Sequence, residues 1–221
     1  MLTPDLEFFF DPSCPFCWIT SKWVRVVRDE LGIEVRWSYI SLETLNAPYD
    51  DKVYETWHHG GRRMHRVIAA AAEEHGQDIV GPLYEAIGTA IWESAGPSDQ
   101  AGLARAMGEK ADLPVILERL GLPTDLASAV DDDSLDHLFE AGTKEALSRA
   151  GDDVGTPIIT FDPDGDVPSS FFGPVISEVP TPQDSVALYR ALETAARIPS
   201  FSELKRSKRD APDLALLHGT D

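Results

Sequence analysis

The chain has 221 residues, of which 43% are hydrophobic, so it is long enough to bury a core without disulfides or metal ions. Its 38 acidic and 19 basic residues give a formal net charge of −19, which opposes binding to nucleic acids and to anionic membrane surfaces. No apolar run approaches the ~20 residues of a membrane span, and the first residues lack the basic start of an export signal. We therefore expect a globular cytoplasmic protein with no nucleic-acid or membrane partner.

The first part of the chain predicts a strand, a helix and a second strand. Leu6–Phe10 is an apolar run of strand length, and a helical pattern extends from Cys14 until Gly32, a residue type that commonly ends helices. Alternating apolar and polar residues then predict a second strand over 33–40. This order is a β-α-β unit.

The middle of the chain, from about residue 48 to residue 150, changes to the periodicity of helices. Apolar residues repeat at three- and four-residue spacing in two stretches that end at Gly76 and Gly96. Further helices are expected to begin at Asp112 and Ser134, whose side chains suit the N-cap position. This region is therefore predicted to be all-helical.

Beyond Gly151 the chain returns to strand patterns and then to a helix. Two short strands, 158–161 and 170–172, flank turn residues rich in Asp, Pro and Gly, which predicts a hairpin. Thr181 and Pro182 have the character of an N-cap and of the first helical residue after it. The order β-α-β, helices, β-β-α predicts an α/β fold in which the two ends of the chain build one sheet.

The only two cysteines, Cys14 and Cys17, form a C-P-F-C motif between the first strand and the first helix. A cysteine at a helix start lies beside free backbone N–H groups and the positive end of the dipole, which favour the reactive thiolate. Pro15 suits this first turn, because its missing N–H costs nothing there. We expect Cys14 to attack a disulfide or another electrophile and Cys17 to attack the resulting mixed disulfide.

Three other interpretations of the cysteine pair fit less well. A structural disulfide would close so short a loop that it would remove only roughly 2 kcal/mol of unfolded-chain entropy, against about 4.7 kcal/mol for a loop of 100 residues. A zinc site needs four ligands, but there is no second cysteine pair and the six histidines are scattered. Two inert buried cysteines would not need the strand, proline and helix around them. We therefore expect no metal site.

Three features together resemble a thioredoxin fold of the DsbA family: Cys14–Trp18 after a strand, a helical region, and Val154–Pro157 before a hairpin. The resemblance implies an α/β, thioredoxin-like fold whose β-α-β and β-β-α halves are separated by a large all-helical insertion. We expect the first half over 1–45, the insertion over 46–150, the second half over 151–200 and a C-terminal tail over 201–221.

Further segments resemble the actinobacterial mycothiol-dependent nitroreductases within that family. They are Asp11-Pro12, 18–21, Ser41-Leu42, Leu45-Asn46, 153–157, 172–175, Phe201 and 203–206. One position departs from the resemblance, because Phe16 stands between the cysteines where this group is associated with tryptophan. An aromatic side chain there would line the substrate groove, so the departure bears on substrate preference more than on the type of reaction.

The resemblance implies a thiol-disulfide oxidoreductase with catalytic Cys14 and Cys17 and no tightly bound cofactor. Mycothiol or another low-molecular-weight thiol would be its reductant, and small disulfides or electrophiles, including nitro compounds, its substrates. The residues expected at the substrate groove are Pro15, Phe16, Trp18, Asn46, Thr156 and Pro157. The alternative for Trp18 is a place in the core, where a tryptophan that follows a helical turn is often found. The Thr156–Pro157 bond is expected to be cis and to lie beside Cys14.

Two alternative functions are compatible with these observations. An enzyme of the kappa glutathione transferase or 2-hydroxychromene-2-carboxylate isomerase type would share the fold and use a thiol cofactor. Its chemistry needs no resolving sulfur, so the presence of Cys17 argues against it. A metal-binding or interaction module is the alternative from a different class.

Overall fold

A four-stranded sheet forms the centre of the computed structural model, which describes residues 3–208 and 210–218. The strands are β1 (Leu6–Phe10), β2 (Val35–Tyr39), β3 (Ile158–Phe161) and β4 (Ser169–Phe172), in the order β2-β1-β3-β4. β1 pairs in parallel with β2 and antiparallel with β3, which in turn pairs antiparallel with β4. Strands from the two ends of the chain therefore lie side by side, as the sequence predicts.

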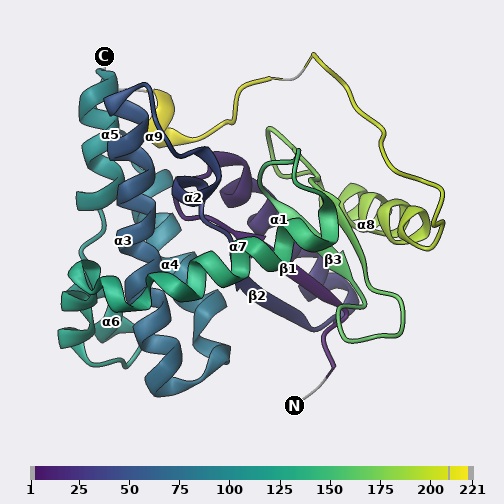
Figure 1. Ribbon diagram of the computed structural model, residues 1–221, viewed down its shortest axis with the longest axis horizontal. Helices are drawn as coiled ribbons and strands as arrows, with labels where there is room; N and C mark the ends of the chain where they lie inside the picture. The colour runs from purple at the N-terminus through teal and green to yellow at the C-terminus, as the bar shows by residue number, and fades with distance from the viewer. Residues whose placement is uncertain (1–2, 209, 219–221) are drawn as a thin grey trace.

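Helices cover the sheet and extend to one side of it (Figure 1). They are α1 (Pro15–Leu31), α2 (Leu42–Asn46), α3 (Lys52–His75), α4 (Val80–Trp92), α5 (Gln100–Glu109), α6 (Leu113–Arg119), α7 (Asp136–Ala150), α8 (Pro182–Ala196) and α9 (Ala215–His218). Short 3-10 turns occupy Gln77–Ile79, Thr124–Asp131 and Asp133–Leu135. Helix α1 packs against α8, α7 packs against β2 and β4, and α3 to α6 gather beside the sheet (Figure 1).

The residues of β1 divide the core between the two faces of the sheet. Leu6, Phe8 and Phe10 join the main hydrophobic cluster with residues of α1, whereas Phe9 packs with Ala146 of α7. Successive side chains of a strand point to opposite faces, so a strand covered on both faces must be apolar at nearly every position. The result is a layered thioredoxin-like fold, which confirms the predicted fold class.

Helix α1 begins and ends where its sequence indicates, and α8 begins where its sequence indicates. Cys14 is the N-cap of α1, and Gly32 ends that helix in the left-handed conformation with φ of 67°. Thr181 caps α8 by accepting a hydrogen bond from the backbone N–H of Asp184, and Pro182 occupies the first turn. These signals are local, so the surrounding fold does not alter them.

Two details of the helical region differ from the sequence prediction. Helix α7 begins at Asp136 rather than at Ser134, because a 3-10 turn precedes it. Helix α5 is not among the helices predicted from the sequence, because its many Ala and Gly residues form no broad apolar stripe; these small residues let it approach α3 closely. A Cβ atom on Gly60 of α3 would lie 2.8 Å from the backbone nitrogen of Gly108. Close backbone packing replaces large side chains at this contact.

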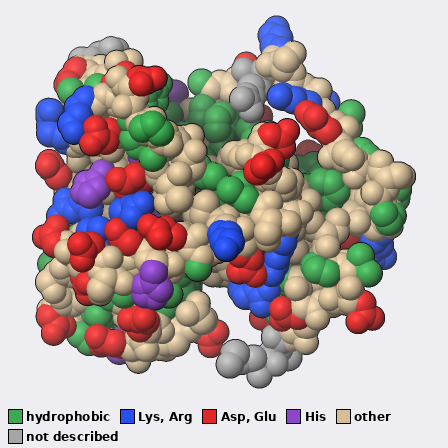
Figure 2. Space-filling view, viewed as in Figure 1, with side chains coloured by type: hydrophobic (Ala, Val, Ile, Leu, Met, Phe, Trp, Pro, Cys, Tyr) green, Lys and Arg blue, Asp and Glu red, His purple; other side chains and the backbone are tan. Residues whose placement is uncertain are grey.

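The surface shown in Figure 2 carries many acidic side chains, interspersed with basic ones, over the helical part of the molecule. Between the helical part and the sheet the same face is hollowed, and hydrophobic side chains gather there (Figure 2). In the described part of the chain no helix combines the length and the apolar character needed to cross a bilayer.

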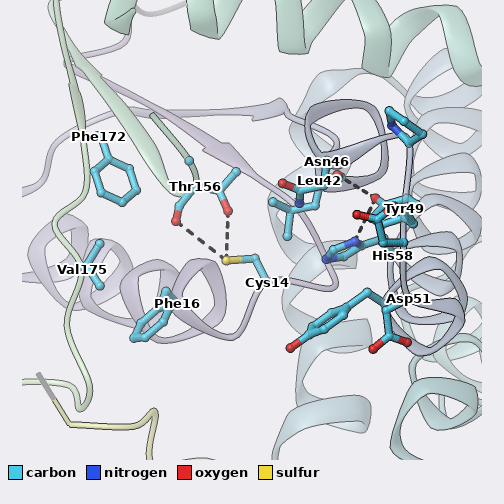
Figure 3. Close-up of a pocket in the computed structure, with 14 residues that line it drawn as sticks. Cys14, Phe16, Leu42, Asn46, Tyr49, Asp51, His58, Thr156, Phe172 and Val175 are labelled. Carbon is cyan, nitrogen blue, oxygen red and sulfur yellow. Dashed lines mark hydrogen bonds between the residues drawn. The ribbon is translucent and has the colours of Figure 1, made fainter. Parts of the chain in front are cut away.

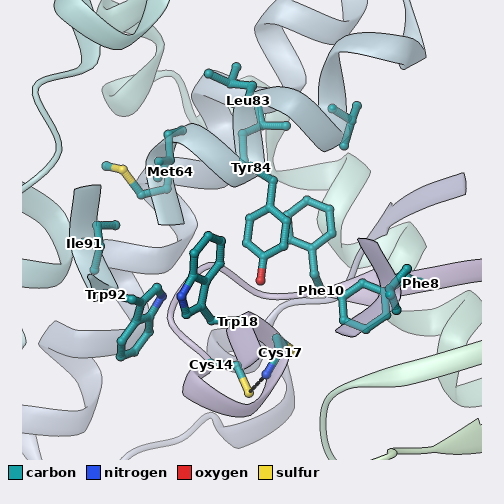
Figure 4. Packing of buried hydrophobic residues seen from close by; sticks show 14 of the residues in the cluster. Phe8, Phe10, Cys14, Cys17, Trp18, Met64, Leu83, Tyr84, Ile91 and Trp92 are labelled. Carbon is teal, nitrogen blue, oxygen red and sulfur yellow. Dashed lines mark hydrogen bonds between the residues drawn. The ribbon is translucent and has the colours of Figure 1, made fainter. Parts of the chain in front are cut away.

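A cluster of aromatic side chains joins the helical region to the sheet (Figure 4). Tyr84 of α4 stacks on Phe10 of β1 with ring centroids 3.9 Å apart, and Trp18 of α1 meets Tyr84 edge-on at 5.8 Å. Helix α4 lies so close to α1 that a Cβ atom on Gly88 would be 2.2 Å from the Trp18 ring. This contact fixes the helix that carries the cysteines against the helical region.

We expect Gly88→Ala to lower the free energy of unfolding by about 1–3 kcal/mol, because the added methyl group overpacks the Trp18 ring. Gly108→Ala is the matched control, since a Cβ atom there would come no closer than 3.4 Å to its neighbours and alanine favours a helix. Urea unfolding followed by circular dichroism measures both variants. Wild-type stability of the Gly88 variant would show that α4 moves away from Trp18 without cost.

Candidate active site

The segment between β1 and α1 is held by hydrogen bonds to a buried carboxylate. Asp11 is only 1% exposed, and its Oδ1 accepts from the backbone N–H and the hydroxyl of Ser13, at 2.7 and 2.5 Å. Its Oδ2 accepts from the backbone N–H of Leu42 at 2.6 Å. Indole N–H groups of α3 and α4 donate to the carbonyls of Ser13 and Pro12. These bonds tie the start of α1 to α2 and to the helical region.

The Cys14 sulfur accepts two hydrogen bonds at the start of α1. The backbone N–H of Cys17 donates at 3.2 Å (Figure 4), and the hydroxyl of Thr156, in the turn before β3, donates at 3.0 Å (Figure 3). The other dashed line in Figure 3 joins the sulfur to the carbonyl of Thr156 at 3.9 Å, to which the protonated thiol can donate. Burial raises the pKa of the Cys14 thiol, but the hydrogen bonds from Cys17 and Thr156 outweigh it, so the pKa lies below its ordinary value. The arrangement favours the thiolate.

Cys17 lies one turn further into the helix and has the opposite character. It is fully buried, and burial, together with the hydrogen bond and charge of Cys14, raises its pKa well above the ordinary value. Both cysteines are free thiols in this structure. An incoming reagent therefore meets Cys14 first, while Cys17 lies behind it inside the helix.

A groove of about 630 Å³, a size typical of small-molecule sites, opens beside Cys14 (Figure 3). Its lining residues are Cys14, Phe16, Leu42, Asn46, Pro48, Tyr49, Asp50, Asp51, Tyr54, His58, Gly155, Thr156, Phe172 and Val175. Phenylalanine and tyrosine supply four of them and aspartate two, and no lysine or arginine is found among the described residues that line the groove. The groove therefore suits an uncharged or cationic ligand better than an anionic one.

Most of the residues predicted for the site lie in or next to this groove. Cys14, Phe16, Asn46 and Thr156 line it. Pro15 and Pro157 adjoin lining residues in the chain but do not line the groove themselves. The Thr156–Pro157 bond is cis, as the resemblance implies, and Thr156 contacts Cys14 directly.

Trp18 differs from the expectation that it lines the substrate groove. Its side chain is 2% exposed and packs in the aromatic cluster between α1 and α4. Its indole N–H donates to Glu93 at 2.8 Å, on the α4 side of the helix. Although Trp18 follows Cys14 by only four residues, its side chain is buried against Gly88. Phe16 lines the groove instead.

The structure adds groove residues that the sequence prediction omits, above all Tyr49, Tyr54 and His58. His58 Nδ1 lies 2.9 Å from the Tyr49 hydroxyl, which donates to the carbonyl of Leu42 at 3.0 Å. A sequence signal existed for part of this set. Tyr54, His58 and Gly61 follow one another at spacings of four and three residues, so they share one face of α3.

Cys14 caps a helix beside a thioredoxin-like sheet, Cys17 follows one turn later, and the Thr156-Pro157 turn lies against Cys14. These features together define a thiol-dependent oxidoreductase of thioredoxin fold. In the described part of the chain no group of three or more His, Cys, Asp or Glu residues is arranged to hold a metal ion. The family model described as "Rv2466c-like: Mycothiol-dependent nitroreductase Rv2466c" matches residues 13–206. The chain belongs to this family.

Individual proteins are similar to this chain in sequence or in fold. The chain is 29% identical to the uncharacterized protein Rv2286c of Mycobacterium tuberculosis over 209 residues, which are 93% of this chain and 83% of that protein. Cytosolic disulfide reductase DsbM from Pseudomonas aeruginosa is 19% identical, with a TM-score of 0.51 and coverage of 86% of this chain and 98% of DsbM. A 2-hydroxychromene-2-carboxylate isomerase is 15% identical, with a TM-score of 0.56 and coverage of 87% and 96%. The two solved structures establish the shared fold.

We expect Thr156→Val to raise the pKa of Cys14 by about one unit, because a hydrogen bond to a charged group contributes about 1.5 kcal/mol or more. The rate of alkylation by iodoacetamide, followed against pH with mass spectrometry to locate the adduct, measures this pKa. Thr194→Val, on the exposed side of α8, is the matched control. A wild-type midpoint at or above the free-thiol value of about 8.5 would contradict the thiolate interpretation.

Proposed function

We propose that the protein is a cytoplasmic, mycothiol-dependent reductase of small disulfides and electrophiles, including nitro compounds, that acts through Cys14 and Cys17. The observation that carries the proposal is the contrast between the two sulfurs. Cys14 accepts hydrogen bonds at a groove and has a lowered pKa, whereas Cys17 is buried behind it with a raised pKa. The description of the family names both mycothiol and the nitroreductase activity.

The reaction with a disulfide substrate needs only these two sulfurs and a small thiol. The Cys14 thiolate bonds to one substrate sulfur, and the other substrate sulfur leaves as a thiolate and takes a proton. Cys17 loses its proton and bonds to Cys14, which releases the second half of the substrate as a thiol. One mycothiol then opens the Cys14–Cys17 disulfide by bonding to Cys14, and a second mycothiol releases the first as mycothiol disulfide.

The lining of the groove supports a small uncharged thiol as the reductant. Asp50 and Asp51 repel glutathione, which carries two carboxylates, whereas mycothiol carries none and presents sugar hydroxyls to aromatic and carboxylate side chains. DsbM, which shares the fold, has also been solved with glutathione, so this fold accommodates small thiols. The isomerase shares the fold as well, but its chemistry uses no second sulfur, and the buried Cys17 favours the reductase.

We expect Cys14→Ser to abolish turnover and Cys17→Ser to trap mycothiol on Cys14. The second variant forms the mixed disulfide but lacks the sulfur that resolves it. Intact-protein mass spectrometry after incubation with mycothiol disulfide detects the adduct, and Cys14→Ser under the same conditions is the control. Equal activity of the two variants would remove or reverse the assigned roles.

We expect mycothiol to reduce the oxidised enzyme several-fold faster than glutathione at low ionic strength, because the described residues that line the groove include two aspartates but no lysine or arginine. Added salt should accelerate glutathione more than mycothiol, because screening weakens the repulsion. Stopped-flow tryptophan fluorescence measures both rates.

A thioredoxin system should reduce the oxidised enzyme more slowly than either small thiol, since Cys14 is only 4% exposed and the surrounding helices limit access by a protein. Faster reduction by thioredoxin, with no mycothiol adduct on Cys17→Ser, would overturn the assignment.

A further inference from the structure

His58 is a titratable groove residue that the two-sulfur reaction leaves without a role. It projects from α3, is 9% exposed overall and lines the groove that Cys14 also lines. Figure 3 shows its imidazole reaching into the groove from the side across from Thr156. The Tyr49 ring lies tilted against it at 5.3 Å between centroids, and the Tyr54 ring stacks on it at 6.3 Å. These two rings flank the imidazole.

The hydrogen bonds around His58 define which ring nitrogen carries the proton. Tyr49 has one hydroxyl proton, which it donates to the carbonyl of Leu42. The Tyr49 oxygen must therefore accept from His58, so Nδ1 carries a proton. In the neutral ring Nε2 then holds a free lone pair. Nε2 has no hydrogen-bond partner among the described residues, and it is not sealed from the solvent of the groove.

The titratable groups around His58 come from three other segments. Asp11 follows β1, Glu43 lies in α2, and the Tyr49 hydroxyl lies in the loop before α3. Burial lowers the pKa of His58, while the carboxylates of Asp11 and Glu43 oppose the shift without cancelling it. The imidazole is therefore neutral at physiological pH and can accept a proton.

We propose that Nε2 of His58 accepts the proton of the small thiol that enters the groove to reduce the Cys14–Cys17 disulfide. The inference rests on the proposed function and adds a third catalytic residue to it. At neutral pH a thiol with a pKa of about 8.5 is only a few per cent thiolate, so a base beside the disulfide removes the main obstacle to attack. A neutral imidazole at the groove matches that need.

The proposed step balances without any further reagent. The thiol proton moves to Nε2, the thiol sulfur bonds to Cys14, and the bond between Cys14 and Cys17 breaks. The electron pair of the broken bond stays on Cys17, and burial, which raises the pKa of Cys17, favours uptake of a proton from water. His58 then returns its proton to the solvent of the groove. One thiol and one disulfide have become one mixed disulfide and one thiol.

The pH profile of reduction tests this role with N-acetylcysteine amide, an uncharged cysteine derivative, as the thiol. With His58 as the base, the wild-type rate should be nearly flat between pH 6.5 and 8, because both reacting forms, neutral imidazole and intact thiol, prevail there. His58→Asn keeps a donor for Tyr49 but has no basic nitrogen. Its rate should rise about tenfold per pH unit with the thiolate fraction, and it should be about 100-fold slower than wild type at pH 6.5.

His59→Asn is the matched control, because its side chain is 53% exposed and lies outside the groove lining. It should keep the flat wild-type profile. A wild-type rate that rises tenfold per pH unit would overturn the proposal even if the His58 variant failed to fold. A loss of rate in His58→Asn that persists equally above the pKa of the thiol would also overturn it. At such a pH the thiol is already ionised and needs no base, so the loss would be structural. If N-acetylcysteine amide gives the flat profile but mycothiol does not reduce the enzyme, the proposed reductant is wrong and the role of His58 stands.

Discussion

The chemistry of this protein depends on the two hydrogen bonds that the Cys14 sulfur accepts. One donor, the backbone N–H of Cys17, belongs to the start of α1, and the other, the hydroxyl of Thr156, belongs to the turn before β3. These donors are far apart in the chain and meet only because β1 pairs with β3. The favoured thiolate is therefore a product of the assembled sheet as well as of the local C-P-F-C motif.

The helical region takes part in the site as well as bordering it, and α3 shows how. A Cβ atom on Gly61 would lie 2.7 Å from the Ser13 side chain, so the helix passes close to the loop that precedes Cys14. One turn earlier the same face presents His58 to the groove, and one turn later His65 contacts the carbonyl of Phe10 at 3.1 Å. A single face of α3 thus supports the loop, lines the groove and abuts β1.

The sequence predicts the fold well because its signals are local: an apolar strand, a cysteine cap, Gly32 after α1 and Thr181 before α8. The candidate site is predicted only in part. From the sequence, Trp18 can lie either in the groove or in the core, because the direction of its side chain depends on the space that Gly88 of α4 leaves for the ring. Helical spacing places His58 on one face of α3 with Tyr54 and Gly61, and it places His59 on another face. Only the packing of α3 shows that the face with His58 borders the groove and that His59 faces solvent.

The two cysteines affect each other's pKa in a way that orders the reaction. The pKa of Cys17 is raised by burial and also by the hydrogen bond and the negative charge of Cys14. When Cys14 bonds to a substrate sulfur, its negative charge is lost. One of the causes that raise the pKa of Cys17 is then removed. Cys17 therefore becomes easier to deprotonate only after the mixed disulfide has formed. In the free enzyme it stays protonated, so it does not compete with Cys14 for the substrate, and the resolving step follows the first attack.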